Sequence, residues 1–466
     1  MELLDNLKKK VLKLFKKDKG DGAGGAAVSS NHYLSGKEIR AIAKANAKEM
    51  RRLEKQKNRR APESEYITQM KDENNILEIE NLHTYFFTDQ GVVKAVNGVE
   101  FSIPLNATVG VVGESGCGKS VTSMSVMRLL QGPSGQIVEG SIRFKANDFK
   151  RDEHGKYIPI YEKDENGNIV YEPVTDKNGN PKLDKDGKPV TRPKQVRDED
   201  GLGKFEMEER VFDIAKMPIR DMYRLRGRQM AMVFQEPMTS LNPVFTIGNQ
   251  LDEVTLLHVP EATKKFAKKR SIEMLNMVGI AMPERVYASF PHELSGGMRQ
   301  RVMIAMALAC EPRLIIADEP TTALDVTIQA QVLELFNDIK KKIHGSILLI
   351  THDLGVIAEM ADYVVVMYAG RIIEKGTASE IFHKPCHPYT QGLQKSKPTM
   401  KSSGDKLFNI PGNVPNPVDM PDHCYFKERC SQCRAECGDK YPEMAQISPT
   451  HFVACHLYDK AGNDGE

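Results

Sequence analysis

The chain has 466 residues, and its 65 basic and 63 acidic side chains leave a formal net charge of only +2. Hydrophobic residues make up 40% of the chain, which is enough for a large core and excludes a wholly disordered protein. No stretch approaches the roughly 18 uninterrupted apolar residues of a spanning helix, so the sequence excludes a membrane-spanning channel. The lysine-rich start is not a secretory signal, and we expect two to three domains inside the cell.

The small net charge conceals a division along the chain. Residues 1–60 carry 17 Lys and Arg against 7 Asp and Glu, whereas the remaining 406 residues carry 48 against 56. Within residues 1–19, apolar side chains recur at helical spacing between lysines, and a Gly/Ala tract follows. This basic arm is either a solvated tail or an amphipathic helix that adsorbs to anionic lipid. The body has no basic excess, so we do not expect a protein that coats nucleic acid.

The body begins near residue 76 with strand-like patterns over residues 76–82, 92–103 and 109–112. Residues 148–211 then interrupt the pattern with repeated Asp-x-x-Gly units, which begin at Asp152, Asp164, Asp176 and Asp184. Asp at the first position and Gly at the fourth suit a type I turn, so we predict inserted β-hairpins. A calcium loop is the alternative, but its required ligand spacing is absent.

A phosphate-binding loop is predicted after the strand at 109–112, because Gly113 to Ser120 satisfy G-x-x-x-x-G-K-[ST] before a helical stretch. Glycines let successive backbone N–H groups point at phosphate oxygens. Lys119 can reach the β- and γ-phosphates, and the Ser120 hydroxyl can ligate Mg²⁺. An ordinary glycine turn is the alternative. The candidate ATP contacts are Gly113, Ser115, Gly116, Cys117, Gly118, Lys119, Ser120 and Val121.

Two carboxylates follow a buried-type strand that begins at Leu314. Asp318 would hold Mg²⁺ through water, and Glu319 is placed to polarise the attacking water. The alternative is a solvated strand end, which the neighbouring phosphate loop disfavours.

The string Leu294-Ser295-Gly296-Gly297-Met298-Arg299-Gln300 resembles the signature sequence of ATP-binding-cassette (ABC) ATPases. The resemblance implies that Ser295, Gly296 and Gly297 face the γ-phosphate held by a second subunit. Further matches implied by the family are a Q-loop glutamine that senses Mg²⁺, a D-loop aspartate and a switch histidine, namely Gln235, Asp325 and His352. The family also stacks an aromatic residue on adenine, and of Tyr85, Phe86 and Phe87 we favour Phe86.

Finer strings, which include residues 236–243, 368–371, 387–390 and 410–412, resemble the D-type ATP-binding subunit of oligopeptide/dipeptide permeases. The resemblance covers about residues 76–147 and 212–457. It implies a P-loop (RecA-like) α/β ABC domain with an antiparallel β subdomain, a helical signature subdomain and a C-terminal cysteine-rich extension. We accordingly expect an arm at 1–75, the ATPase domain at 76–385 with the insert 148–211, and the extension at 386–466.

Five of the eight cysteines fall within the last 43 residues, which favours a metal site in an intracellular protein. The resemblance implies a [4Fe–4S] cluster on Cys424, Cys430, Cys437 and Cys455, with Cys433 as an extra thiol. Zinc is the alternative, because Cys430 and Cys433 also have zinc-ligand spacing, and a site without metal is the third.

The resemblance implies an ATPase that powers import of oligopeptides or dipeptides from the cytoplasmic face of the membrane. Its implied partners are a second, related F-type ATPase chain, two transmembrane permease subunits and an extracellular substrate-binding protein. Import of another solute, such as a nickel chelate, stays open. A soluble ABC ATPase that acts on ribosomes or DNA is disfavoured, because the chain has one phosphate loop and a hairpin-like insert. A purely regulatory module is disfavoured by the filled catalytic positions.

Overall fold

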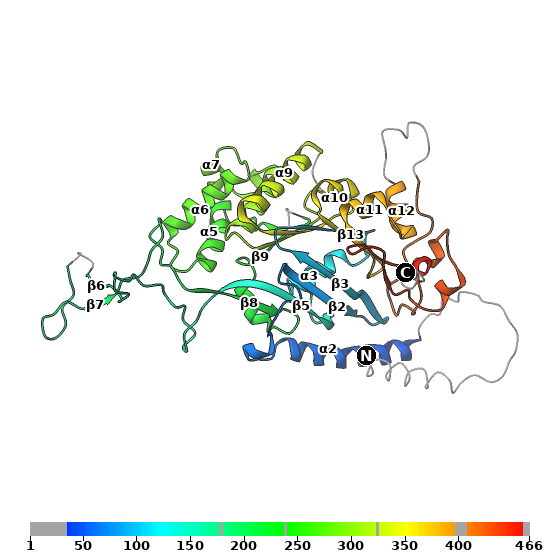
Figure 1. The fold of residues 1–466 in the computed structure, drawn as a ribbon, viewed down its shortest axis with the longest axis horizontal. Helices are drawn as coiled ribbons and strands as arrows, with labels where there is room; N and C mark the ends of the chain where they lie inside the picture. Colours follow the sequence, from blue (N-terminus) through cyan, green and yellow to red (C-terminus); the bar gives the residue numbers. More distant parts are fainter. Residues whose placement is uncertain (1–34, 177–179, 237–239, 323–325, 397–407, 460–466) are drawn as a thin grey trace. The chain divides into compact units, whose positions relative to one another are not determined.

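The computed structural model describes residues 35–176, 180–236, 240–322, 326–396 and 408–459 (Figure 1). The chain divides into Met1–Ala41 and Ile42–Glu466. Helix α2 (Gly36–Lys57) begins in the first unit and continues into the second. In the described part of the chain, no helix is long and apolar enough to cross a membrane. The predicted amphipathic helix in residues 1–19 and the D-loop residue Asp325 lie outside the described residues.

The second unit is organised around an eight-stranded sheet in the order β14-β15-β13-β12-β4-β11-β10-β9. Five neighbouring strands pair in parallel and supply the sheet's centre: β9 (Met230–Val233), β10 (Leu314–Asp318), β11 (Ser346–Ile350), β4 (Thr108–Val112) and β12 (Tyr363–Tyr368). Nearly every residue of these strands is buried, which is why they read as continuous apolar runs in the sequence.

Alternate side chains of the parallel strands enter two different cores. Ile315 and Ala317 pack with the helical side of the sheet. Leu314 and Ile316 pack with a five-stranded antiparallel sheet on the other side, as the twofold period of a strand requires (Figure 1). One group of helices packs together: α5 (Ile247–His258), α6 (Lys264–Met277), α7 (Pro283–Ala288) and α8 (Gly296–Leu308). Four other helices each follow a strand of the large sheet: α3 (Lys119–Val126), α9 (Val326–Ile343), α10 (Leu354–Met360) and α11 (Ala378–His383), and α12 (Pro388–Lys395) follows α11.

The antiparallel sheet has the order β1-β8-β5-β2-β3. Its strands are β1 (Ile67–Thr68), β8 (Met207–Asp213), β5 (Gly135–Phe149), β2 (Asn75–Phe87) and β3 (Val92–Pro104). Strand β1 and the buried Tyr66 precede the expected boundary at residue 76, so this sheet begins earlier than the sequence indicates. Helix α2 packs against this sheet, because Leu53 of α2 contacts Tyr85 and Phe87 of β2.

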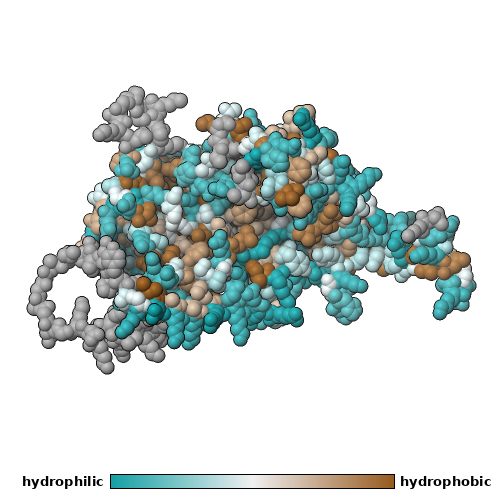
Figure 2. Space-filling view, turned by 180° about the vertical axis from the view of Figure 1, so that it is seen from behind, coloured by the Kyte–Doolittle hydropathy of each residue, from teal (hydrophilic) through white to brown (hydrophobic). Residues whose placement is uncertain are grey.

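The insert between β5 and β8 consists of short hairpins, with β6 (Tyr171–Pro173), β7 (Thr191–Pro193) and a series of isolated bridges. At each described turn an aspartate Oδ1 accepts hydrogen bonds from the backbone N–H groups two and four residues ahead, as Asp164 does from Asn166 and Asn168. Asp198 to Gly201 form another such turn, which the sequence reading missed. Figures 1 and 2 show the insert projecting away from the two sheets, with a largely hydrophilic surface.

The C-terminal extension continues the large sheet. Strand β13 (Arg371–Thr377) pairs with β12 and with β15 (Phe452–Ala454), and β14 (Met444–Gln446) covers the edge of β15. The five clustered cysteines lie between residues 424 and 455, around the short turns η5 (Lys427–Arg429), η6 (Ala435–Gly438) and η7 (His456–Tyr458). The extension is therefore bound to the same sheet that carries the phosphate loop.

Candidate active site and cysteine site

The phosphate loop joins β4 to α3 and is wedged between two other strands. A Cβ atom at Gly113 would lie 2.3 Å from the Met367 carbonyl oxygen, and one at Gly118 would lie 2.3 Å from that of Ala95. Both glycines also adopt positive φ, at +155° and +103°. Only glycine satisfies both constraints, so the loop's shape follows directly from its composition.

Lys119, Ser120 and Asp318 come together at the start of α3. Lys119 is buried, and its Nζ donates to the carbonyl oxygens of Gly113 at 2.8 Å and Glu114 at 3.2 Å. Ser120 Oγ donates to Asp318 Oδ1 at 3.0 Å. Burial raises the pKa of Asp318, and the adjacent Glu319 carboxylate raises it further. A hydroxyl beside a buried carboxylate with a second carboxylate next to it fits a hard divalent cation such as Mg²⁺.

Glu319 lies at the centre of a group drawn from the ends of three parallel strands. Its Oε2 accepts hydrogen bonds from Gln235 Nε2 at 3.1 Å and Thr322 Oγ1 at 3.0 Å, and lies 3.3 Å from His352 Nδ1. Glu319 adopts a positive φ of 49°, and its N–H donates to the Ile350 carbonyl at 2.8 Å. A non-glycine residue in this region is strained, and such strain concentrates at functional sites. The sequence analysis did not predict a role for Thr322, which its position three residues after Glu319 could have indicated.

The signature residues lie at an accessible helix start. Ser295 is the N-cap of the 13-residue helix α8, and its Oγ accepts from the Met298 N–H at 3.3 Å. Ser295 and Gly296 are exposed, and Gly297 is half-buried. The free N–H groups of this helix end can therefore receive an anion that another molecule presents.

The three aromatic candidates for adenine stacking divide between the faces of β2. Tyr85 and Phe87 are buried in a cluster with Leu53, whereas Phe86 is half-buried. Alternation along the strand places Phe86 on the opposite face from its neighbours. Of the three, it retains accessible ring surface for a ligand.

Four cysteines of the extension form one electrostatically coupled set. Each of the thiols of Cys424, Cys430, Cys437 and Cys455 interacts with the other three. Burial, reinforced by these neighbours, raises the pKa of Cys424 to about 12 and that of Cys455 to about 11. Cys433 is exposed, its thiol donates to the Arg434 carbonyl at 3.6 Å, and its nearest thiols are those of Cys430 and Cys437.

The distances between these thiols show which metal centre they could bind. No three of their sulfur atoms, all in the described part of the chain, lie within 4.8 Å of one another. Four thiolates around one tetrahedral zinc ion at about 2.3 Å would be about 3.8 Å apart. The described thiols are therefore spaced more widely than the ligands of one zinc ion. Four cysteine thiolates are also the usual ligand set of an iron–sulfur cluster.

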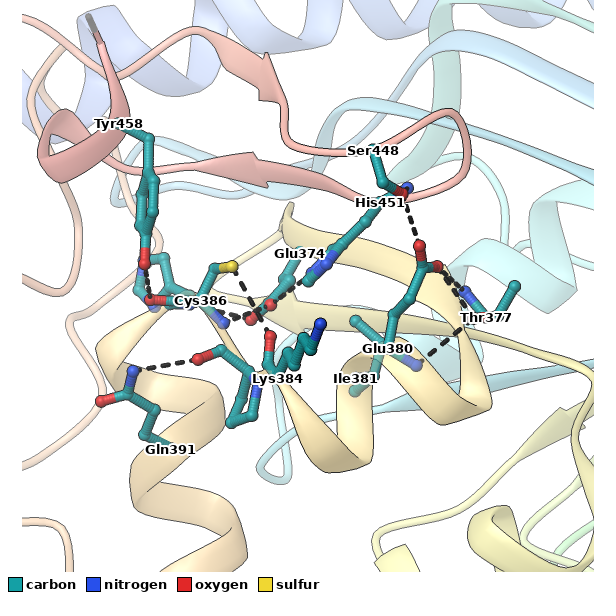
Figure 3. Close-up of polar contacts among 12 residues, drawn as sticks. Glu374, Thr377, Glu380, Ile381, Lys384, Cys386, Gln391, Ser448, His451 and Tyr458 are labelled. Carbon is teal, nitrogen blue, oxygen red and sulfur yellow. Dashed lines mark hydrogen bonds and ion pairs between the residues drawn. The ribbon is translucent and has the colours of Figure 1, made fainter. Parts of the chain in front are cut away.

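A separate buried group, Glu374, Cys386 and His451, joins the extension to the sheet (Figure 3). The Glu374 carboxylate accepts from the N–H groups of Cys386 at 2.6 Å and His387 at 3.0 Å, and from His451 Nε2 at 2.8 Å. The Cys386 thiol donates to the Lys384 carbonyl at 3.6 Å. These hydrogen bonds satisfy the group without an ion, so we interpret it as a polar anchor.

Together, a glycine-rich loop before a helix, paired carboxylates at a neighbouring strand end and a separate signature helix define a P-loop ATPase of the ABC class. Sequence comparison agrees, because a model described as "ABC transporter" matches residues 96–166 and 202–322, and one described as "Oligopeptide/dipeptide transporter, C-terminal region" matches residues 373–437. The predicted ABC fold is confirmed.

Curated relatives give the same assignment. The oligopeptide transport ATP-binding protein AppD of Bacillus subtilis is 42% identical over 83% of this chain and 98% of its own length. The oligopeptide transport ATP-binding protein OppD of Bacillus subtilis is 42% identical over 82% of this chain and 88% of its own length. The dipeptide transport ATP-binding protein DppD of the same organism is 41% identical over 83% of this chain and 95% of its own length. This chain belongs to the ATP-binding subunits of the oligopeptide/dipeptide ABC transporter family, and it is an ATPase.

Proposed function

We propose that this chain hydrolyses ATP to power import of oligopeptides or dipeptides through separate membrane subunits. The observation that carries the proposal is the meeting of Gln235, Glu319 and His352 beside the Ser120–Asp318 pair. The names of the relatives supply the solute class.

In the proposed reaction, the loop amides from Gly113 to Val121 and the Lys119 ammonium bind the phosphates, and Phe86 stacks on adenine. Ser120, Asp318 and Gln235 hold Mg²⁺, which neutralises charge on the phosphates. Glu319 orients and polarises the attacking water. His352 and Lys119 stabilise the charge that develops on the γ-phosphate.

A second ATPase subunit, a related F-type chain, completes the site in this proposal. Its signature residues, matching Ser295, Gly296 and Gly297 here, contact the γ-phosphate across the interface, and Asp325 belongs to the D-loop at that interface. Closure on ATP and opening after hydrolysis drive two transmembrane permease subunits, to which an extracellular binding protein delivers the solute. The chain itself is peripheral, at the cytoplasmic face of the membrane.

The extension holds a structural [4Fe–4S] cluster on Cys424, Cys430, Cys437 and Cys455 in this proposal, supported by the mutual interaction of the four thiols. We also propose the domain division into an arm at residues 1–75, the ATPase domain at 76–385 with the insert 148–211, and the extension at 386–466. In this division, α2 and β1 at the end of the arm pack on the ATPase domain's antiparallel sheet. An anaerobic absorption spectrum near 400 nm with iron and sulfide analysis tests the cluster. Stoichiometric zinc without that absorption would contradict it.

A detergent pull-down with mass spectrometry tests the transport role. We expect a related ATPase chain and two integral membrane proteins, and we expect peptide with its binding protein to stimulate ATP turnover by the reconstituted complex. Co-purification with ribosomal proteins or DNA, and no membrane subunit, would contradict the proposal.

A further inference from the structure

The cysteine-bearing extension reaches the phosphate loop through one arginine. Arg429 Nη1 donates to Glu114 Oε2 at 2.7 Å, and Nη2 donates to Glu114 Oε1 at 2.9 Å. Glu114 is the second residue of the phosphate loop and lies 315 residues from Arg429 in the chain. Two parallel hydrogen bonds between a guanidinium and a carboxylate fix both direction and distance.

Arg429 is held rigidly on its own side of this contact. Its side chain is only 5% exposed, its Nε donates to the Pro411 carbonyl at 2.9 Å, and it lies over the rings of Tyr368 and Phe426. The Arg429 end of this ion pair is buried, whereas Glu114 is partly exposed, so removal of Glu114 would leave the buried guanidinium without its charged partner.

The backbone of Glu114 is fixed at the same place. Its N–H donates to the Tyr389 hydroxyl at 2.9 Å, and Tyr389 lies on α12 and is fully buried. The Glu114 carbonyl in turn accepts from Lys119 Nζ at 3.2 Å. The position of residue 114 therefore affects where the phosphate-binding lysine lies.

The other end of this connection is the cysteine site. Arg429 occupies the turn η5 and directly precedes Cys430, and the Cys424 N–H on the other side of the turn donates to the Cys437 carbonyl at 3.1 Å. The turn that presents Arg429 is thus bounded by two cysteines of the four-thiol set. A change in the spacing of these thiols would therefore move the turn that presents Arg429 to Glu114.

We propose that Arg429 is a positioning residue for the phosphate loop and makes nucleotide affinity depend on the state of the cysteine site. The inference rests on the proposed nucleotide role of this loop and on the proposed occupancy of the four thiols. Loss of the metal centre from the cysteine site would then weaken ATP binding at the phosphate loop.

The test measures ATP and ADP affinity by calorimetry on the full chain, before and after the cysteine centre is removed with a chelator. We expect removal to weaken ATP binding about tenfold, a change typical of coupling between distant residues. Arg429→Met should bind ATP as weakly as the stripped protein and respond little to chelation. Glu428→Gln, an exposed change in the same turn, is the matched control and should behave as wild type.

A double-variant cycle separates the contact from the metal. Glu114→Gln with Arg429→Met should be no worse than either change alone, and Arg429→Lys should recover part of the affinity. Circular dichroism verifies that each variant is folded. Wild-type affinity in folded Arg429→Met, or equal losses on chelation with and without Arg429, would overturn the inference. A wild-type protein without any metal would contradict the proposed cofactor, whereas the cycle would still decide the role of Arg429.

Discussion

The hairpin insert and the surroundings of the phosphate loop are built from opposite kinds of contact. In the insert, turn aspartates bond to backbone groups two and four residues ahead. Around the loop, Ser120 bonds to Asp318, which is 198 positions away in the chain. Glu114 bonds to Tyr389 and Arg429, which are 275 and 315 positions away. A single turn such as that of Asp164 can therefore change without disturbing distant elements, although the insert also contacts α6 through Asp200 and Lys269. Any change at the phosphate loop, by contrast, affects several distant elements.

Glu319→Gln should give the largest effect, because this carboxylate collects contacts from three strand ends. We expect ATP hydrolysis to fall at least about 100-fold, as loss of a general base requires, while ATP remains bound and the closed dimer accumulates. Phosphate release and size-exclusion chromatography with ATP measure the two effects. Glu359→Gln, an exposed change on α10, is the control. Wild-type turnover by Glu319→Gln would remove Glu319 from the role.

Gly118→Ala and Gly167→Ala compare the two regions directly, because the two glycines have positive φ values of 103° and 82°. Each change imposes a backbone cost of about 1–2 kcal/mol. Only the Cβ at position 118 also meets another backbone atom, since the space at Gly167 is empty within 4 Å. We expect Gly118→Ala to abolish ATP binding and Gly167→Ala to leave ATP affinity unchanged. Loss of affinity in Gly167→Ala would show that the two regions are coupled.

Leu53→Ala tests a region where the sequence is a poor guide. Leu53 is 5% exposed and packs with Tyr85 and Phe87 on the strand that carries Phe86. Removing such a buried side chain costs about 2–5 kcal/mol. Thermal unfolding should detect this loss, and Lys55→Ala, on the exposed side of α2, should not reproduce it.

The same packing changes how the arm is to be deleted. Deletion of residues 1–60 would remove Leu53 and destabilise the antiparallel sheet, so a loss of ATP binding there would say nothing about lipid. Deletion of residues 1–34 keeps that contact, and we expect it to weaken binding to anionic vesicles while ATP binding is retained. Equal vesicle binding with and without residues 1–34 would contradict a membrane role for the arm.

What the sequence predicts follows the same division between near and distant contacts. The phosphate loop, the strand before it and the Asp-x-x-Gly turns depend on neighbouring residues, so their patterns are visible in the chain. Leu53 continues a helical spacing of apolar residues with Ile39, Ile42 and Met50, which predicts a helix but does not reveal that this helix packs on the antiparallel sheet. Arg429 reads as an ordinary charged residue, because its partner Glu114 is 315 positions away and only the folded sheet brings them together.

Asp164→Ala should give the smallest effect, confined to one turn of the insert. Backbone hydrogen bonds, above all the one from Asn168, lower the pKa of the fully exposed Asp164. Because the folded pKa is below the ordinary value, the carboxylate stabilises the turn above that value, and the stabilisation is lost as the pH falls through the folded pKa. Protection of the Asn166 and Asn168 amides, measured as their exchange rate relative to the intrinsic rate at each pH, should therefore be lost in acid in the wild type.

In Asp164→Ala, exchange at these two amides should be fast at neutral pH and should show no acid transition of its own, while ATP turnover stays at the wild-type level. Asp184, which makes the same pair of bonds to Asp186 and Lys188, provides an internal control in the same sample. If the loss of Asp164 also increased exchange at the Asp184 turn, the hairpins would be cooperative, and the contrast between a locally built insert and a globally connected phosphate loop would not hold.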